Sequence, residues 1–350
     1  MADDWIPDEL AELLEADLQP TAAAPVAPPA AETLPDQPAP KRRCGTPTEP
    51  SDWKVTFAQS VLLRTFCENV GNILTECYFE VVHSKDPDGF SGLSVESIDQ
   101  GRVCLVQARL SGQVMVSPQA PEGPRGFCVR MSNLTSSLKS GHACHFVDLW
   151  QPARSSDVAF RIYEPNVSNG SQEFTLRTLA KGNDCQGLNG LEYNLFVEID
   201  LETFRGAIRM AKEHKADVLS LAVYTPKDKG PPGSPVVSFF VISYDADEVS
   251  AKFPYPSSTE SEVHVDGKPT VIRANDAASM GLDGLPALEE LDTVFSDRFG
   301  VEHLFHFVRG MERRELTLRL DQGKPLLLEY PMGGSSRADY IRFVLAPKIQ

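Results

Sequence analysis

From Trp53 onward, the same order of helix-like and strand-like segments occurs twice in this chain. Apolar residues recur with the period of a helix over 57–74, and short alternating runs typical of β-strands follow. A segment near 133–139 repeats the helical pattern before further strand-like runs. This order predicts an α+β fold of two similar domains, each with two helices packed on antiparallel sheets.

The expected elements can be placed on the sequence. In the first half we expect helices at 57–74 and 133–139, and strands at 78–82, 103–110, 145–150 and 158–163. In the second half we expect helices at 201–214 and 301–309, and strands at 192–199, 218–224, 236–244, 315–320, 326–330 and 340–345. The matching order of the two halves is the basis for two domains.

The first 50 residues differ in composition from the rest. Residues 20–50 are dense in Pro and Ala and cannot bury enough apolar surface to offset ordering, so we expect a disordered tail. Within the tail, apolar residues over 6–14 have the spacing of a short amphipathic helix, which could dock on a partner or fray in solvent. The predicted boundaries are a tail at 1–50, domain 1 at 51–165, a connector at 166–191 and domain 2 at 192–350.

Charge and cysteine content narrow the function. The formal net charge of −16 argues against a protein that coats DNA or an anionic membrane with its whole surface, so any nucleic-acid contact must be local. The 7 cysteines are scattered without a C-x-x-C pair, which favours a reducing compartment over a disulfide framework or a zinc site. No apolar run is long enough for a membrane span, so we expect a soluble intracellular protein without a membrane partner.

No catalytic motif is visible in the sequence. Phosphate-loop, nucleophile-elbow and zinc-protease patterns are all missing. The pairs His142/His145 and His303/His306 could suggest metal ligands, but each pair has too few neighbouring ligand residues, and packing is the favoured interpretation. We therefore expect no enzyme, no cofactor and no metal.

The C-terminal region carries a family resemblance. Segments 324–330 and 343–349, including the string L-A-P-K-I, resemble the last two strands and tail of the proliferating cell nuclear antigen family of DNA sliding clamps. Segments 93–107 and 133–136 resemble further family motifs, the latter as N-L-T-S, so the resemblance runs from 55 to 350. Long segments at 84–90, 226–235 and 257–291 indicate a divergent member, viral or from a distant eukaryotic lineage.

The resemblance implies a ring that encircles duplex DNA, tethers DNA polymerase and other replication and repair proteins, and needs a clamp loader ATPase. A homotrimer in the nucleus, or at a viral replication site, is implied, and the short basic run at 41–43 could serve nuclear import. Positions matching the family's DNA-facing cations are Arg64, Lys139, Arg209 and Arg309. Arg205, Arg209 and Lys212 also form a stripe at helical spacing, although ordinary solvated helix residues would give the same pattern.

A second implied surface accepts short partner peptides with aromatic anchors. The matching positions are Ile98, Val103, Leu188, Pro325, Val344, Ala346 and Pro347. Small and aliphatic side chains suit such a socket, while Ile98 and Val103 could equally fill the core. Ring closure is expected to pair the strand at 158–163 of one subunit with the strand at 249–253 of the next.

Three other interpretations remain open. A checkpoint-type clamp subunit of a heterotrimeric ring shares the fold but does not usually keep the intact C-terminal string. A monomeric viral processivity factor needs a concentrated basic face, which a net charge of −16 does not favour. An α+β enzyme of unknown type is supported only by the lack of evidence against it.

Overall fold

The computed structural model describes residues 51–86, 88–118, 123–153, 155–167, 170–180, 191–227, 238–257, 270–274, 290–311, 315–332 and 339–348. The predicted tail at 1–50, with its amphipathic pattern and basic run, and Leu188 of the predicted peptide pocket lie outside these residues. Within the described part of the chain, no helix is both long and apolar enough to cross a membrane.

The first half contains two helices and nine strands among the described residues. In chain order they are β1 Ser51–Phe57, α2 Ser60–Gly71, β2 Glu76–Val82, β3 Gly92–Ile98, β4 Cys104–Ser111, β5 Gln113–Val116, β6 Gly126–Arg130, α3 Met131–Leu138, β7 Phe146–Pro152, β8 Val158–Tyr163 and β9 Gln172–Leu176.

The second half repeats this order. Its elements are β10 Leu195–Asp200, α4 Leu201–Glu213, β11 Val218–Pro226, β12 Phe239–Asp245, β13 Ser250–Pro256, β14 Thr270–Ala274, β15 Leu291–Gly300, α5 Val301–Val308, β16 Glu315–Leu320, β17 Leu326–Pro331 and β18 Tyr340–Leu345.

The strands form three sheets with the same wiring in each half. The order β5-β1-β7-β8-β9 in the first half corresponds, strand for strand, to β14-β10-β16-β17-β18 in the second. The order β4-β3-β2-β6 likewise corresponds to β13-β12-β11-β15. One difference is that β5 runs antiparallel to β1, whereas β14 runs parallel to β10. The predicted α+β fold with an internal repeat is therefore confirmed.

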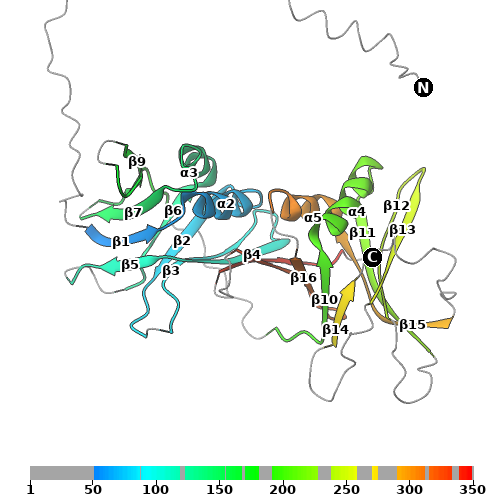
Figure 1. The fold of residues 1–350 in the computed structure, drawn as a ribbon. Coiled ribbons are helices and arrows are strands. Elements are labelled where there is room, and N and C mark those ends of the chain that lie inside the picture. Colours follow the sequence, from blue (N-terminus) through cyan, green and yellow to red (C-terminus); the bar gives the residue numbers. More distant parts are fainter. Residues whose placement is uncertain are drawn as a thin grey trace, which may run out of the picture. The chain divides into compact units, whose positions relative to one another are not determined.

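The two halves join through a backbone ladder. β18 pairs antiparallel with β4 from Tyr340 to Leu345, and this pairing makes one nine-stranded sheet from both halves. The buried carboxylate of Asp339 accepts hydrogen bonds from Ser111 N at 2.7 Å and from Ser111 Oγ, which helps to fix the register of the two strands. Figure 1 shows the four helices on the same side of this sheet.

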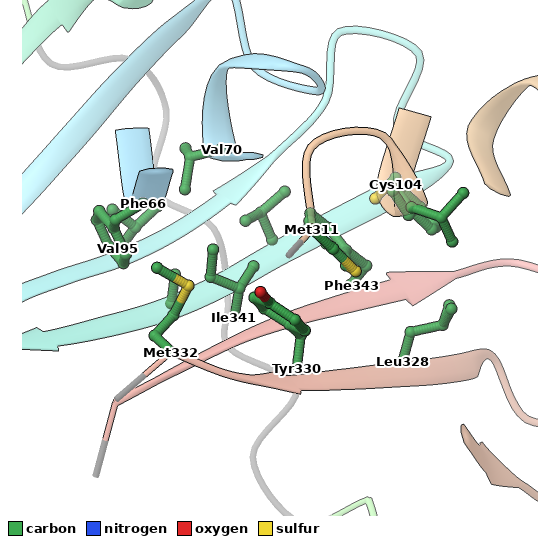
Figure 2. Packing of buried hydrophobic residues seen from close by; sticks show 14 of the residues in the cluster. Phe66, Val70, Val95, Cys104, Met311, Leu328, Tyr330, Met332, Ile341 and Phe343 are labelled. Atoms are coloured by element: carbon green, nitrogen blue, oxygen red, sulfur yellow. The ribbon is translucent and has the colours of Figure 1, made fainter. Parts of the chain in front are cut away.

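Buried residues of both halves form one continuous hydrophobic cluster next to the β18–β4 ladder. Figure 2 shows Phe66 and Val95 of the first half in the same buried cluster as Tyr330 and Phe343 of the second. The rings of Phe307 and Phe343 stack with centroids 4.5 Å apart, so α5 is packed directly onto β18. The junction is thus held by side-chain packing as well as by backbone hydrogen bonds.

Three expectations for the elements need correction. The helix expected at 57–74 begins only at Ser60, because Trp53, Val55 and Phe57 alternate into the core and belong to β1, which pairs with β7. The long loop expected over 257–291 contains β14. The predicted connector at 166–191 contains β9, which pairs with β8, while 181–190 lie outside the described residues.

A buried carboxylate joins three strands of the five-stranded sheet. Asp148 on β7 is fully buried, and its Oδ2 lies 2.8 Å from Lys54 Nζ and 2.9 Å from Arg161 Nη2. Thr56 Oγ1 donates to Asp148 Oδ1 at 2.8 Å. Burial alone would raise the pKa of Asp148, but these hydrogen bonds and the charge of Lys54 outweigh it and lower the pKa.

We expect Asp148→Asn to destabilise the protein by about 3 kcal/mol at neutral pH, because it leaves two partly buried cations without their counterion. Since the folded-state pKa of Asp148 is lowered, its stabilisation is present above the ordinary Asp pKa and is lost as pH falls through the folded value. Urea unfolding at several pH values should show the two proteins converging below about pH 4. A gap that stays constant down to the lowest pH would contradict this role of the charge.

Candidate functional site

The helix face is built from two packed pairs, α2 with α3 and α4 with α5. Of the four described helices, α4 has the clearest sequence pattern, with an N-terminal cap and an apolar face. Asp200 caps its first turn by accepting from Thr203 N at 3.1 Å, and the apolar residues Phe204 and Ile208 are buried. The opposite face of α4 is left for polar and charged residues.

Three of the six predicted DNA-binding cations are exposed on this face. Lys139 follows α3, Arg209 lies on α4 and Arg309 follows α5. Arg64 on α2 is half-buried, with its Nε 4.0 Å from Glu68 Oε1. An exposed cation keeps its charge available for a phosphate, whereas a neighbouring carboxylate partly neutralises it.

Lys139 and Arg309 line one groove of about 780 Å³, although they belong to different halves of the chain. Asn72 at the end of α2 donates from Nδ2 to Arg309 O at 2.8 Å, which holds the ends of α2 and α5 together. Arg130 also lines the groove and was missed by the sequence analysis. It ends β6 just before α3, so no helical spacing marks it.

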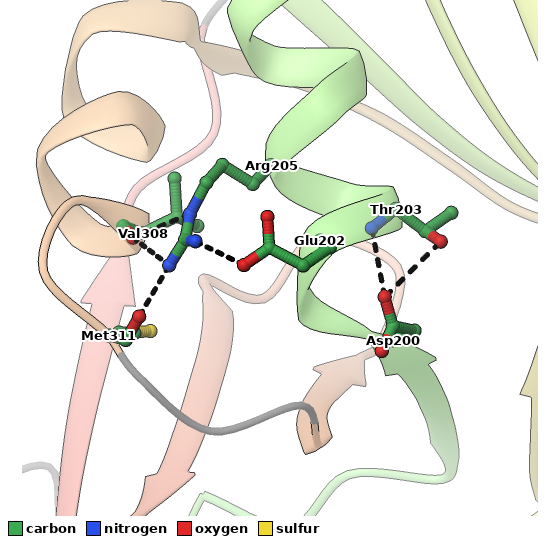
Figure 3. A network of polar contacts seen from close by, with 6 residues as sticks. All are labelled: Asp200, Glu202, Thr203, Arg205, Val308 and Met311. Carbon is green, nitrogen blue, oxygen red and sulfur yellow. Dashed lines mark hydrogen bonds and ion pairs between the residues drawn. The ribbon is translucent and has the colours of Figure 1, made fainter.

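Arg205 has a different position from its neighbour Arg209. Figure 3 shows its guanidinium reaching α5, where Nε and Nη2 donate to Val308 O at 3.2 and 3.0 Å. Nη2 also donates to Met311 O at 2.5 Å, and Nη1 pairs with Glu202. Val308 is in the last turn of α5, where carbonyls lack helical partners, and Met311 follows the helix, so Arg205 holds α4 to the end of α5.

Lys212 also bridges α4 and α5. Its Nζ lies 3.0 Å from Glu302 Oε2 and 3.8 Å from the centroid of the Phe305 ring. The hydrogen bond from Lys212 is the main cause of a lowered pKa for Glu302, and His306 Nε2 lies 3.0 Å from the same carboxylate. Lys212 is therefore partly neutralised in this arrangement.

The predicted peptide pocket is assembled from both halves. A pocket of about 150 Å³ is lined by five of the seven predicted residues, namely Ile98, Val103, Pro325, Val344 and Ala346, together with Arg102, Cys104 and Leu105. Ile98 and Val103 are 40% and 38% exposed, so the interpretation that they fill the core is wrong. Pro347 is half-buried beyond Ala346 and does not line the pocket.

A short loop shapes the first-half side of this pocket. Asp99 Oδ1 accepts from Val103 N at 2.8 Å and from Cys104 N at 2.7 Å, and Arg102 takes a left-handed conformation with φ of 55°. Ala346 N donates to Val103 O at 3.0 Å, which ties the C-terminal segment to the loop. Leu105, Tyr193, Leu327 and Val344 form a small buried cluster under the pocket. Hydrogen bonds and buried side chains thus hold the described lining of the pocket in place.

The strand expected to close a ring needs correction. β8 already has a partner on each side, β7 and β9, so the strand at 158–163 has no open edge. β9 is the last strand of that sheet, and β13 is the corresponding last strand of the four-stranded sheet. β9 and β13 are therefore terminal strands with an open edge, and by the internal repeat they are the equivalents of β18 and β4.

Comparison with solved structures agrees with this architecture. The proliferating cellular nuclear antigen of Entamoeba histolytica is similar over 86% of this chain and 100% of its own, with a TM-score of 0.60 and 13% identity. The fold is that of a DNA sliding clamp. A chain of a PCNA2–PCNA3 complex from Sulfolobus tokodaii is similar over 84% of this chain and 99% of its own, with a TM-score of 0.57 and 13% identity. No protein-family model and no curated protein matches the sequence.

The two arginines of α4 should differ in their effect on stability. We expect Arg205→Lys to lower the free energy of unfolding by about 1–2 kcal/mol, because a single ammonium cannot replace the branched contacts to the carbonyls of Val308 and Met311. The exposed residue Arg209 serves as the control, and Arg209→Ala should change stability by less than about 0.5 kcal/mol. Urea unfolding measures both, and equal effects would contradict the distinction.

Proposed function

We propose that this protein is a DNA sliding clamp that encircles duplex DNA and tethers DNA polymerase and other replication and repair proteins, in the nucleus or at a viral replication site. The observation that carries the proposal is the strand wiring. Within the chain, β18 joins β4 and makes a continuous sheet, and the repeat leaves the equivalents of these two strands, β9 and β13, open at the ends. Pairing β9 of one subunit with β13 of the next continues the same pattern.

A closed ring pairs every β9 edge with a β13 edge, because each subunit then has a neighbour on both sides. Three two-domain subunits are what the family resemblance implies. The similar PCNA2–PCNA3 complex contains two different chains, and this favours a mixed ring of paralogues, including a checkpoint-type clamp, as the second candidate.

The helix face supplies the chemistry for non-specific DNA contact. Lys139, Arg209 and Arg309 are exposed there, and Arg130 lines the same groove as Lys139 and Arg309. A few cations centre a duplex through its phosphates without reading bases, so the ring can slide. No catalytic step is required, and retention on DNA depends on the closed path of the backbone around it.

The pocket between the two halves gives the clamp its second activity. Its apolar lining, with Ile98 and Val103 on the rim and Val344 beneath, suits the anchor side chains of a short helical peptide. DNA polymerase, a clamp loader ATPase and other partner proteins carrying such peptides would be held on the ring through this pocket.

The topological proposal predicts retention without tight binding. We expect a native mass of about three times the 38.4 kDa chain in light scattering. In a second experiment, the protein is threaded onto a DNA duplex tethered at one end, and the free end is then either blocked or left open. A high-salt wash should leave the protein on the blocked duplex and remove it from the open one. Equal loss from both duplexes would contradict encirclement, whereas a monomer that assembles only with a paralogue would support the mixed ring.

The exposed cations should set the salt dependence of DNA association. We expect Arg209→Ala and Arg309→Ala each to weaken binding and to reduce the slope of log K against log salt by about 1. Lys85→Ala is the control, because Lys85 is equally exposed but lies between β2 and β3, away from the helices. Fluorescence anisotropy with a labelled duplex measures the slopes. An equal change in the control would assign the effect to net charge.

The partner pocket can be tested separately. We expect Val103→Asp to weaken binding of a synthetic helical peptide with two aromatic anchors by at least about tenfold, because a carboxylate would be placed against the apolar anchor. Val294→Asp is the matched control, since Val294 is 51% exposed and does not line this pocket. Isothermal titration measures both, and unchanged peptide binding by the Val103 variant would remove this pocket from the proposal.

A further inference from the structure

The open edge of β13 has an unusual composition. The strand reads Ser-Ala-Lys-Phe-Pro-Tyr-Pro, with prolines at 254 and 256, and among the described strands only β12 pairs with it along its length. A proline has no N–H to donate, so its effect depends on whether its nitrogen faces β12 or the open side.

Two hydrogen bonds decide this direction. Ser257 N donates to Ser238 O at 2.7 Å, and Ala246 N donates to Val249 O at 2.9 Å. Both pairs fit the β12–β13 register, so the odd-numbered residues of β13 face β12. The even-numbered residues Ser250, Lys252, Pro254 and Pro256 therefore direct their backbone groups to the open edge.

The open edge is consequently short. Pro254 and Pro256 offer carbonyls but no donors there, and Pro256 is buried where neighbouring Ser257 bridges Ala274. Only Ser250 and Lys252 can both donate and accept toward a strand lying alongside. The equivalent strand inside the chain, β4, has no proline and pairs with β18 over six residues, from Tyr340 to Leu345.

The open edges of β9 and β13 carry exposed side chains of opposite charge, Glu173 and Lys252. In the β18–β4 ladder, buried residues face buried residues, as Phe343 faces Val106. On β9, Phe174 stacks on Phe160 and faces the core, so Glu173 lies on the opposite face, where it is exposed. Lys252 is exposed on the corresponding face of β13. A β9 strand laid along β13 in the same manner brings Glu173 to the same face as Lys252.

We propose that Pro254 ends the ladder between subunits, so that β9 of a second copy of this chain pairs with β13 only over the stretch around Ser250 and Lys252, with Glu173 beside Lys252. This inference rests on the proposed ring. It assigns the stability of the ring to a short ladder and one charge pair. The subunit junction is therefore weaker than the six-residue junction within the chain and opens before the chain unfolds.

The first test changes the length of the ladder in both directions. Pro254→Val restores an outward donor, and we expect about fivefold tighter association per interface, whereas Ser250→Pro removes one and should weaken association by a similar factor. Neither residue donates to β12, so both variants should keep the fold, which circular dichroism checks. Sedimentation over a dilution series measures the dissociation of the assembly.

The second test identifies the partner strand by exchanging charges. Lys252→Glu and Glu173→Lys should each weaken association, and the double variant should restore it, because the pair is re-formed in the opposite sense. Rescue supports the inference even if Pro254→Val fails to fold. An assembly that ignores both the proline change and the charge exchange would overturn this inference and leave the ring standing. A wild-type chain that stays monomeric at every concentration would overturn the ring made of this chain alone, and with it the pairing between two copies.

Discussion

The antiparallel ladder between β18 and β4 is the interaction on which the rest of the structure depends. It makes one sheet from strands of both halves, and the ring stack of Phe307 on Phe343 places α5 against that sheet. The groove containing Lys139 and Arg309 and the pocket containing Val103 and Val344 both take residues from each half. Neither surface would exist if the halves were joined by a flexible linker, because their residues would not be held at fixed distances.

The two candidate surfaces differ in polarity. On the helix face, Lys139, Arg209 and Arg309 remain exposed to water. Near the sheet ends, the loop held by Asp99 leaves Ile98 and Val103 partly exposed above a buried apolar cluster. One surface is therefore charged and solvated, and the other is apolar and supported by a buried cluster.

Much of the fold could be predicted because the helices and several strands carry strong local patterns. β8, β16 and β18 have the expected bounds, since each alternates or is continuously apolar. β1 was missed, and its last residue, Phe57, was assigned to the first helix because it also fits the helical period. β9 was missed because Gln-Glu-Phe-Thr-Leu has a single aromatic residue among polar neighbours, and this omission led to the wrong edge strand for ring closure.

The site shows a similar division between local and distant information. Arg205 and Arg209 have the same helical spacing, but only the contact with carbonyls about a hundred residues away separates a structural arginine from an exposed one. Val103 was ambiguous for the same reason, since its exposure depends on the loop that Asp99 holds.

The distance along the chain between β4 and β18 also sets an order of events during synthesis. Ser111 and Asp339, which meet at this ladder, are separated by 228 residues. While the ribosome makes the second half, the edge of β4 has no partner from its own chain, and an unpaired edge is a template for wrong pairing. The last described strand of the polypeptide, β18, is the one that covers it. A nascent chain of this protein therefore remains open to misassembly until β18 has been made, and a truncation before β18 would leave that edge exposed permanently.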